Sequence, residues 1–328
     1  MTQIVGGLQR VLAAGLLFVS SATLTSAYAT PWPERTVRIL TGAAGSSGDA
    51  VARILAEALA KRWKQAVVVE NRPSADHILT VQGMVEARDG HTLLFTPHSA
   101  LTVNPLLHEK LPYDPVRDVA PISLAVDDFL CVVVAPSLPI DTLAGFVRHA
   151  RTNPRALNFY AVPGAPYLAY LAFQKRAGIE TTYVPYRNFM SALPDLSQGL
   201  VHVAVMPFAA VRGPVQAGSV KLLAVTNVQR APAAPTVPTV GEAGFPEFTF
   251  GGLLGLFGPK DMPAELRERI ASEVGDILAE PRVTELLMHL GLVARGTSAA
   301  EFAKILDEQR AKWAAIARDH DIRPTGQH

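Results

Sequence analysis

Along most of the chain, short apolar runs alternate with longer segments in which apolar residues recur at helical spacing. Residues 36–41 form an apolar run, and Val51, Leu55 and Leu59 then lie on one face of a helix predicted over 49–64. The same patterns predict further strands at 66–70, 92–96, 157–161, 181–185, 201–206 and 220–226. They predict further helices at 78–88, 141–152, 166–177, 188–198 and 208–217.

Alternating strands and helices predict an α/β fold. Several strands are continuous apolar runs, which is typical of a parallel sheet covered by helices on both faces. After the run 248–257, the pattern changes to three helices at 263–279, 282–290 and 298–319. No strand follows them, so we expect these helices to pack back on the first domain.

The chain is long enough for two domains. At roughly 150 residues per domain, 328 residues give about two. The pattern predicts that the chain crosses between them near 125–135 and again near 248–258. We therefore expect a first lobe from residues 30–128 and 252–328, and a second from 129–251. Two crossings make a hinge, and a cleft between two hinged lobes suits a small ligand.

The first 29 residues have the features of a secretory signal. Arg10 is followed by the apolar run 11–19, and small residues precede a cleavage site predicted after Ala29. The run is shorter than the roughly 20 residues of a membrane span, so an uncleaved anchor is the weaker interpretation. The sequence predicts a soluble exported protein.

Composition and charge exclude several classes of protein. The formal net charge is +1, which gives no sign of nucleic-acid or acidic-membrane binding. A hydrophobic content of 49% excludes a disordered chain. Cys131 is the single cysteine, so no disulfide forms within the chain, and its apolar surroundings predict a buried thiol.

The loop 42–49, between a predicted strand and a helix, is the first candidate site. Its glycines allow backbone N–H groups to approach a ligand, and the helix start adds partial positive charge. These features favour a carboxylate or a phosphate. The spacing matches neither a dinucleotide-binding fingerprint nor a P-loop. A purely structural turn, with Asp49 capping the helix, is an equally weighted alternative.

Motifs for catalysis and metal binding are missing from the sequence. Ser46 and Ser47 are not in a G-x-S-x-G elbow, and the nine histidines include no H-E-x-x-H pair. His77, His98 and His202 are therefore interpreted as ordinary polar or surface residues. We predict no catalytic residue, no metal site and no cofactor. An enzyme stays as the less favoured alternative, because residues distant in sequence can converge.

A series of short motifs runs through most of the chain in a fixed order. They lie at 32–35, 45–49, 67–73, 89–94, 104–105, 111–123, 184–187, 222–226 and 237–246. Together they resemble the periplasmic solute-binding proteins of tripartite tricarboxylate transporters, often called the Bug family.

The resemblance implies a two-lobed periplasmic-binding-protein fold of type II that closes on small carboxylates. Backbone amides, hydroxyls and water from one loop of each lobe would hold the ligand. The matching positions are Gly45, Ser46, Ser47 and Asp49 in the first lobe, and Pro163, Gly164, Ala165, Tyr186 and Arg187 in the second. The resemblance implies a monomer without a cofactor, which delivers an organic acid to inner-membrane transporter subunits. A sensor subunit for a membrane kinase is the alternative.

The chain departs from the family pattern mainly in the loops. Gly42 replaces a common aromatic residue, Gly48 replaces a threonine, and segment 161–168 is shortened and lacks hydroxyls. A glycine-rich stretch becomes 74–77, Pro97 and His98 replace small hydroxyl residues, and His202 and Pro207 replace acids. These changes leave room for an uncharged or aromatic ligand.

Arg187 replaces the usual lysine of the family, and its guanidinium can bind a carboxylate through two parallel hydrogen bonds. A salt bridge at the rim or a solvated side chain is an equally weighted alternative.

Overall fold

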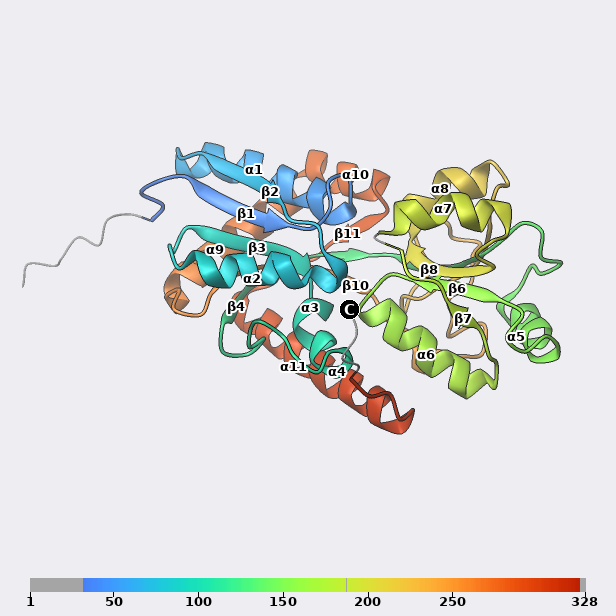
Figure 1. Cartoon of the computed structure of the whole chain (residues 1–328). Coiled ribbons are helices and arrows are strands. Elements are labelled where there is room, and N and C mark those ends of the chain that lie inside the picture. The colour runs from blue at the N-terminus through green and yellow to red at the C-terminus, as the bar shows by residue number, and fades with distance from the viewer. Residues whose placement is uncertain (1–31, 187, 325–328) are drawn as a thin grey trace, which may run out of the picture.

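Two β-sheets, each covered by helices on both faces, lie side by side and form the two halves of the molecule (Figure 1). The computed structural model describes residues 32–186 and 188–324. The predicted secretory signal, residues 1–29, and the predicted ligand residue Arg187 lie outside the described residues. The two-sheet architecture confirms the predicted α/β fold class.

The first sheet has six strands in the order β11-β4-β10-β3-β1-β2. These strands are β1 (Val37–Thr41), β2 (Val67–Asn71), β3 (Thr92–Pro97), β4 (Val119–Asp128), β10 (Gly252–Pro259) and β11 (Leu292–Ala294). One face is covered by α1 (Ser47–Trp63), α9 (Ala264–Ala279) and α10 (Pro281–His289). The other is covered by α2 (Ile78–Ala87), α3 (Ser99–Thr102) and α11 (Ala299–Asp319).

The second sheet has five strands in the order β7-β6-β8-β5-β9. These are β5 (Leu130–Val134), β6 (Asn158–Ala161), β7 (Thr182–Tyr183), β8 (Val203–Pro207) and β9 (Lys221–Val225). Its faces are covered by α5 (Leu143–Thr152) with α6 (Ala165–Ala177), and by α7 (Phe189–Gln198) with α8 (Phe208–Gln216). Three short helical turns complete the chain, namely η1 (Ala75–His77), α4 (Asn104–Leu107) and η2 (Pro246–Phe248).

Both sheets are mixed, whereas the apolar runs alone favoured parallel sheets. β1 pairs in parallel with β2 and β3, whereas β10 runs antiparallel between β3 and β4. In the second sheet, β5 runs antiparallel between β8 and β9. In each case the antiparallel strand follows a passage from the other half. Burial on both faces requires a continuous apolar run whatever the strand direction, so the apolar pattern did not reveal the difference.

The strands are apolar throughout because successive side chains enter different cores. Val37 and Ile39 pack under α1 and α9, while Leu40 faces α2 and α11. In the second sheet, Val132 packs toward α5 and α6, while Cys131 faces α7 and α8. The predicted burial of the Cys131 thiol is therefore confirmed.

The chain passes from the first sheet to the second within one residue. β4 ends at Asp128, and β5 begins at Leu130. The chain returns to the first sheet just before β10, beside this passage. There the Thr226 N–H donates to the Leu130 carbonyl (2.9 Å), and the Phe250 N–H donates to the Thr226 carbonyl (2.7 Å). That residues 30–128 with 252–328, and residues 129–251, move as two lobes stays a prediction.

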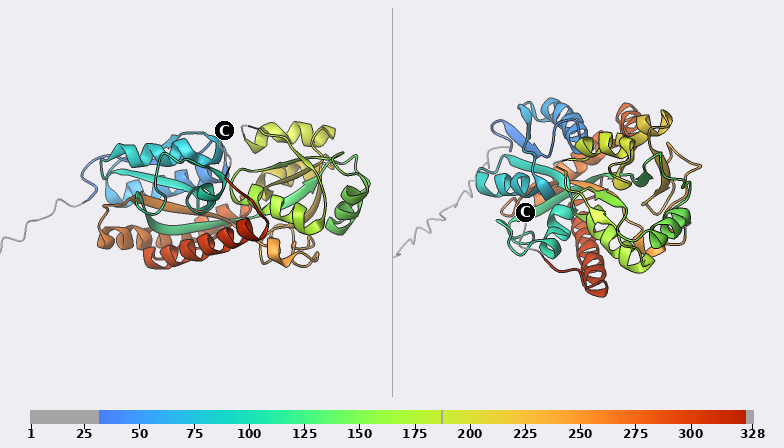
Figure 2. Two further views of the ribbon diagram at one scale, coloured as in Figure 1. Left: turned by 60° about the horizontal axis from the view of Figure 1, so that its bottom comes forward. Right: turned by 45° about the vertical axis from the view of Figure 1, so that its right-hand side comes forward.

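The last helix, α11, contacts both halves. Its first turns lie against β4, and α9 and α10 also pack on the first half, as predicted. The second part of α11 reaches α6, and Trp313 packs edge-on against Phe250, with 5.8 Å between ring centroids. Trp313 is 1% exposed and belongs to the core of the second half. Figure 2 shows α11 running beneath the first half toward the second.

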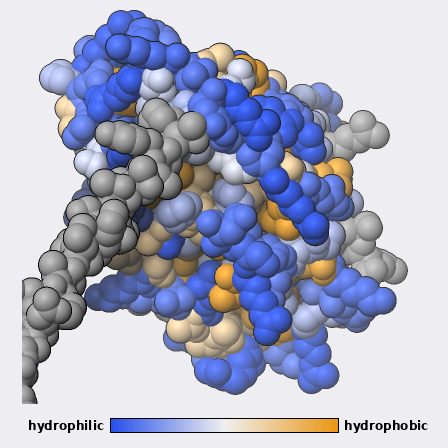
Figure 3. All heavy atoms as spheres, turned by 90° about the vertical axis from the view of Figure 1, so that its left-hand side faces the viewer, coloured by the Kyte–Doolittle hydropathy of each residue, from blue (hydrophilic) through white to orange (hydrophobic). Residues whose placement is uncertain are grey.

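The outer surface of the first half is mainly polar. In Figure 3, hydrophilic residues predominate on this face, and apolar atoms show in small separate groups. No helix within the described residues is both long enough and apolar enough to cross a membrane.

Candidate functional site

A cavity lies between the two halves, at the ends of their strands. Its empty volume is about 710 Å³, including the part open to solvent. The first half contributes the loop before α1 and residues 97–99, and the second contributes the loop before α6 together with Phe189 and Pro207. Of the predicted ligand residues, four line this cavity: Ser46, Ser47, Pro163 and Ala165. This arrangement supports the predicted ligand cleft, but their role as ligand contacts stays a prediction.

The first loop exposes the beginning of α1. Ser46 caps the helix, because its side-chain oxygen accepts a hydrogen bond from the Asp49 N–H (3.2 Å). The N–H groups of Ser47 and Gly48 lie in the first turn, where a helix provides no carbonyl partner. Both residues line the cavity, so α1 directs partial positive charge toward it.

Asp49 holds this loop through hydrogen bonds of its carboxylate and does not line the cavity. Its carboxylate accepts hydrogen bonds from Arg53 (3.2 Å), Asn71 (2.8 Å) and the Gly45 N–H (3.0 Å). Burial favours a higher pKa, but these hydrogen bonds outweigh it and hold the Asp49 pKa below its usual value. Gly45, with φ +77°, lies in the turn that Asp49 closes. The expectation that Asp49 caps the helix is wrong, because Ser46 is the N-cap and Asp49 lies in the first turn, where its carboxylate closes the loop. Ser47 and Gly48 line the cavity.

Sequence analysis missed Asp128, at the end of β4. Its side chain lines the cavity and is 4% exposed, and its Oδ2 atom accepts a hydrogen bond from the Ser47 hydroxyl (2.6 Å). Burial raises the Asp128 pKa to about 7, although the Ser47 hydrogen bond opposes the shift. The signal in the sequence was the acidic pair 127–128 at the predicted crossing of the chain.

The second loop touches the first half through Gly164. This glycine, at the N-cap of α6, has φ +88° and ψ −133°, a conformation open essentially only to glycine. A Cβ atom at position 164 would lie 2.8 Å from Ser99 Oγ of the first half. Gly164 therefore permits a close contact between the halves, while Pro163 and Ala165 line the cavity.

His77 occupies the space that Gly42 leaves open. A Cβ atom at position 42 would lie 2.6 Å from Cε1 of the His77 ring. Asp76 and His77 both have positive φ, 53° and 60°, which is uncommon for residues other than glycine. In the sequence, Gly42 and the stretch 74–77 are separate departures from the family pattern. In the structure, the His77 ring fills the space beside Gly42. His77 lines the cavity, and its buried Nδ1 has no hydrogen-bond partner among the described residues.

His98 also lines the cavity, as a buried polar residue and not a surface one. It is 1% exposed, and its Nδ1 lies 2.9 Å from Thr102 Oγ1. Burial lowers the pKa of His77 to about 4 and that of His98 to about 3. Both rings are therefore neutral at pH 7. His202, away from the cavity, accepts a hydrogen bond from the Asn158 N–H (2.9 Å).

We expect the buried ring of His77 to make the protein sensitive to acid. Between pH 6.5 and about 4 the unfolded chain holds a proton on this ring and the folded protein does not, so stability falls as the pH falls. The expected loss from pH 7 to pH 5 is about 1–2 kcal/mol. Asparagine tolerates positive φ, so His77→Asn is a suitable variant. Its free energy of unfolding, measured with urea at the two pH values, should fall by about 1–2 kcal/mol less than that of the wild type. Equal losses in both proteins would contradict the burial of a neutral ring.

Tyr186 lies outside the cavity wall. Its hydroxyl donates a hydrogen bond to Asp195 of α7, and its ring meets that of Tyr160 edge-on. The structure therefore brings together the loops 46–48 and 163–165 and leaves Tyr186 in the packing of the second half. Among the described residues, no cluster of three or more histidine, cysteine, aspartate or glutamate side chains could hold a metal.

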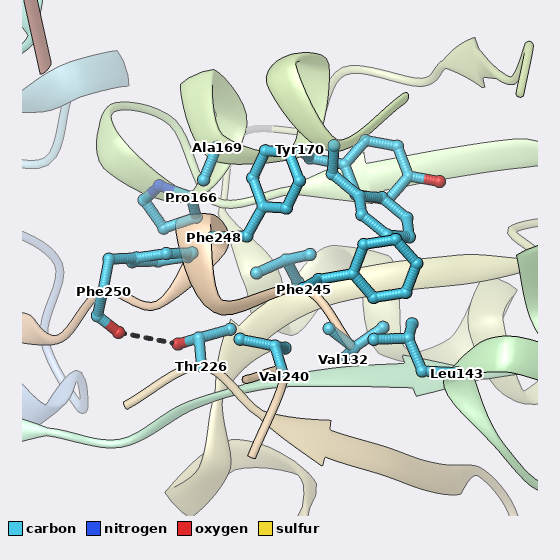
Figure 4. Close-up of a pocket in the computed structure, with 12 residues that line it drawn as sticks. Val132, Leu143, Pro166, Ala169, Tyr170, Thr226, Val240, Phe245, Phe248 and Phe250 are labelled. Carbon is cyan, nitrogen blue, oxygen red and sulfur yellow. Dashed lines mark hydrogen bonds between the residues drawn. The ribbon is translucent and has the colours of Figure 1, made fainter. Parts of the chain in front are cut away.

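A second cavity, inside the second half, is apolar. Figure 4 shows it between α6, the sheet and segment 240–250, with aromatic side chains around it. Its polar side chains are Thr226, whose hydroxyl donates to the Phe250 carbonyl (3.0 Å), and Tyr170, whose hydroxyl lies 3.3 Å from Thr181 Oγ1. With both hydroxyls already engaged, this cavity lacks groups for an organic anion.

Solved structures share this architecture, which is that of periplasmic binding proteins. The structure of R. palustris Rpa4515 with adipate is 27% identical, has a TM-score of 0.83, and covers 90% of this chain and 100% of that chain. MatC from Rhodopseudomonas palustris with bound malate is 26% identical, has a TM-score of 0.79, and covers 87% of this chain and 99% of that chain.

The sequence also defines the family. The pattern of the tripartite tricarboxylate transporter family receptor matches residues 51–322, so the chain belongs to this family. A UPF0065 protein of Bordetella bronchiseptica is 30% identical over 326 residues, which are 98% of this chain and 96% of that protein. The resemblance found in the short motifs is confirmed, and the chain is a solute-binding protein of this family.

Proposed function

We propose that the protein binds a small organic carboxylate in the cavity between its halves and presents it to a membrane transporter. The observation that carries this proposal is the first turn of α1 in the cavity wall, with the N–H groups of Ser47 and Gly48 at its end. Such helix starts bind carboxylates well. The related proteins with adipate and malate support the same ligand class for this chain.

The second half would close on the ligand. The loop before α6 lines the cavity opposite α1, and α6 begins there with Ala165. Its N-terminal dipole adds to that of α1, so both halves attract the same negative group. A ligand that contacts both loops binds the closed form better than an open one and so favours closure. Arg187 is proposed to add a paired hydrogen bond to the carboxylate.

We propose transport without a catalytic step. In the cavity the Ser47 hydroxyl donates to Asp128 and not to a histidine, so it is not part of a serine–histidine pair. Residues 1–29 are proposed to direct export to the periplasm, where the membrane subunits of the transporter would receive the loaded protein.

The test is a thermal-shift and calorimetry panel of dicarboxylates, tricarboxylates, aromatic acids and amino acids on the mature protein. A ligand at one hundred times its Kd adds about 2.7 kcal/mol of stability. Arg187→Ala should weaken binding of the acid that binds the wild type most tightly. Arg148→Ala, on the exposed surface of α5, should not. If no organic acid binds, the proposed function is wrong. If Arg187→Ala leaves affinity unchanged, only the role of Arg187 is wrong.

A further inference from the structure

The carboxyl group of Asp128 has one partner and one free oxygen. Its Oδ2 accepts the Ser47 hydrogen bond, whereas its Oδ1 is buried and has no hydrogen-bond partner among the described residues. Leaving a buried polar atom unpaired is costly, so native proteins rarely do it without a reason. Because Asp128 lines the cavity, a ligand is the natural partner for this oxygen.

The surroundings hold this side chain in place without neutralising it. A Cβ atom at position 252 would lie 2.9 Å from Cβ of Asp128, so β10 packs closely against it. The neighbouring Asp127 is paired with Arg295 (3.2 Å), and no described lysine or arginine forms an ion pair with Asp128. The Asn227 side chain donates only to the Asp128 backbone carbonyl (3.4 Å).

Apart from the Asp127–Arg295 pair, the titratable groups beside Asp128 in the cavity wall and on β5 carry no charge at pH 7. His77 and His98 in the cavity wall are neutral rings, and Cys131 on β5 is a buried thiol whose pKa burial raises. None of them supplies a positive charge. A carboxylate brought against the ionised form of Asp128 would meet a like charge, which disfavours that orientation. The carboxylate would instead face the first turn of α1.

We propose that Asp128 accepts a hydrogen bond from an ammonium or hydroxyl group that the ligand carries beside its carboxylate. This inference rests on the proposed function and names its ligand class, amino or hydroxy acids. The free Oδ1 is the acceptor, and the Ser47 hydroxyl holds the carboxyl group in position through Oδ2. Asp128 is then the residue that separates such acids from unsubstituted ones.

The test compares acids that differ in a single substituent. Succinate, L-malate and L-aspartate share one carbon chain, and adipate with 2-aminoadipate gives a longer pair. In calorimetry at pH 8, we expect at least one substituted acid to bind about tenfold more tightly than its unsubstituted partner, since one charge-assisted hydrogen bond is of that size. An advantage of L-aspartate identifies an ammonium group, and an advantage of L-malate identifies a hydroxyl.

Variants assign the preference to Asp128. Asp128→Asn should abolish an ammonium preference, and Asp128→Leu should abolish either preference. Asp127→Asn, which removes an equal charge one residue away, should retain it. In the wild type, an ammonium preference should also strengthen from pH 5.5 to pH 8 as Asp128 ionises, and Asp128→Asn should show no such change.

Three results overturn the inference. They are equal binding of substituted and unsubstituted acids to the wild type, an unchanged preference in Asp128→Leu, and a uniform gain for every acid in Asp128→Asn. The last would mean that Asp128 only repels anions. The wild-type ratios decide the matter even if a variant fails to fold. Failure of every acid to bind the wild type would instead overturn the proposed function.

Discussion

Replacing Gly164 by alanine is expected to weaken binding of a carboxylate ligand by about tenfold or more. The new methyl group would lie 2.8 Å from Ser99 Oγ and 3.2 Å from Ser99 Cβ, so the loop before α6 would be pushed away from the first half. A displacement that costs about 1.4 kcal/mol in the closed form alone lowers affinity tenfold. Calorimetry with adipate and L-malate measures the change.

Gly178, at the other end of the same helix, provides the matched control. It also has positive φ, 59°, but a Cβ atom there would meet nothing within 4 Å. Gly178→Ala should therefore lose stability through backbone strain and keep its affinity for ligand. If both variants bind as the wild type does, the contact between Gly164 and Ser99 is not needed for closure.

Trp313→Ala is expected to reduce the free energy of unfolding by about 3–5 kcal/mol, as large-to-small changes of a buried aromatic residue do. The indole is 1% exposed, and its Nε1 donates to Gln309 (3.1 Å). It also packs edge-on against Phe250 of the returning chain. The variant therefore leaves a cavity at the place where α11 meets the second half. Urea unfolding followed by circular dichroism measures the loss.

A second tryptophan gives the comparison. Trp63, at the end of α1, is partly exposed and packs within the first half alone. Trp63→Ala should cost clearly less than Trp313→Ala, and Trp313→Phe should recover most of the loss because it retains an aromatic ring. A loss below about 1 kcal/mol in Trp313→Ala would show that the site collapses around the missing ring.

The apolar pattern predicted most of the fold because each long element carries its own periodic signal. The helix over 49–64 corresponds to α1 at Ser47–Trp63, and the helix over 298–319 corresponds to α11 at Ala299–Asp319. The pattern did not assign the ten-residue β4 or the five-residue β5 as strands, and the other elements that it missed are short. α3 and α4 have four residues each, and β11 has three, which is too few for a period to show.

The site was only partly predictable, for a different reason. The loop before α1 was found because glycines and the start of a helix lie together in the sequence. His77 and Asp128 were missed because their roles depend on residues far along the chain, Gly42 for the one and Ser47 for the other. Such contacts arise from tertiary packing and leave no local pattern. Whether either residue meets a ligand stays a prediction.

The position of α11 has a mechanical consequence. Its N-terminal turns are fixed on β4, while Trp313 and the segment after it lie against α6 and η2, where the Lys175 amine donates to the His320 carbonyl. If the second half moves away from the first about Phe129, as the two-lobe prediction requires, the end of α11 must either move with it or slide across α6. The contact between α11 and α6 would then limit how far the two halves can separate.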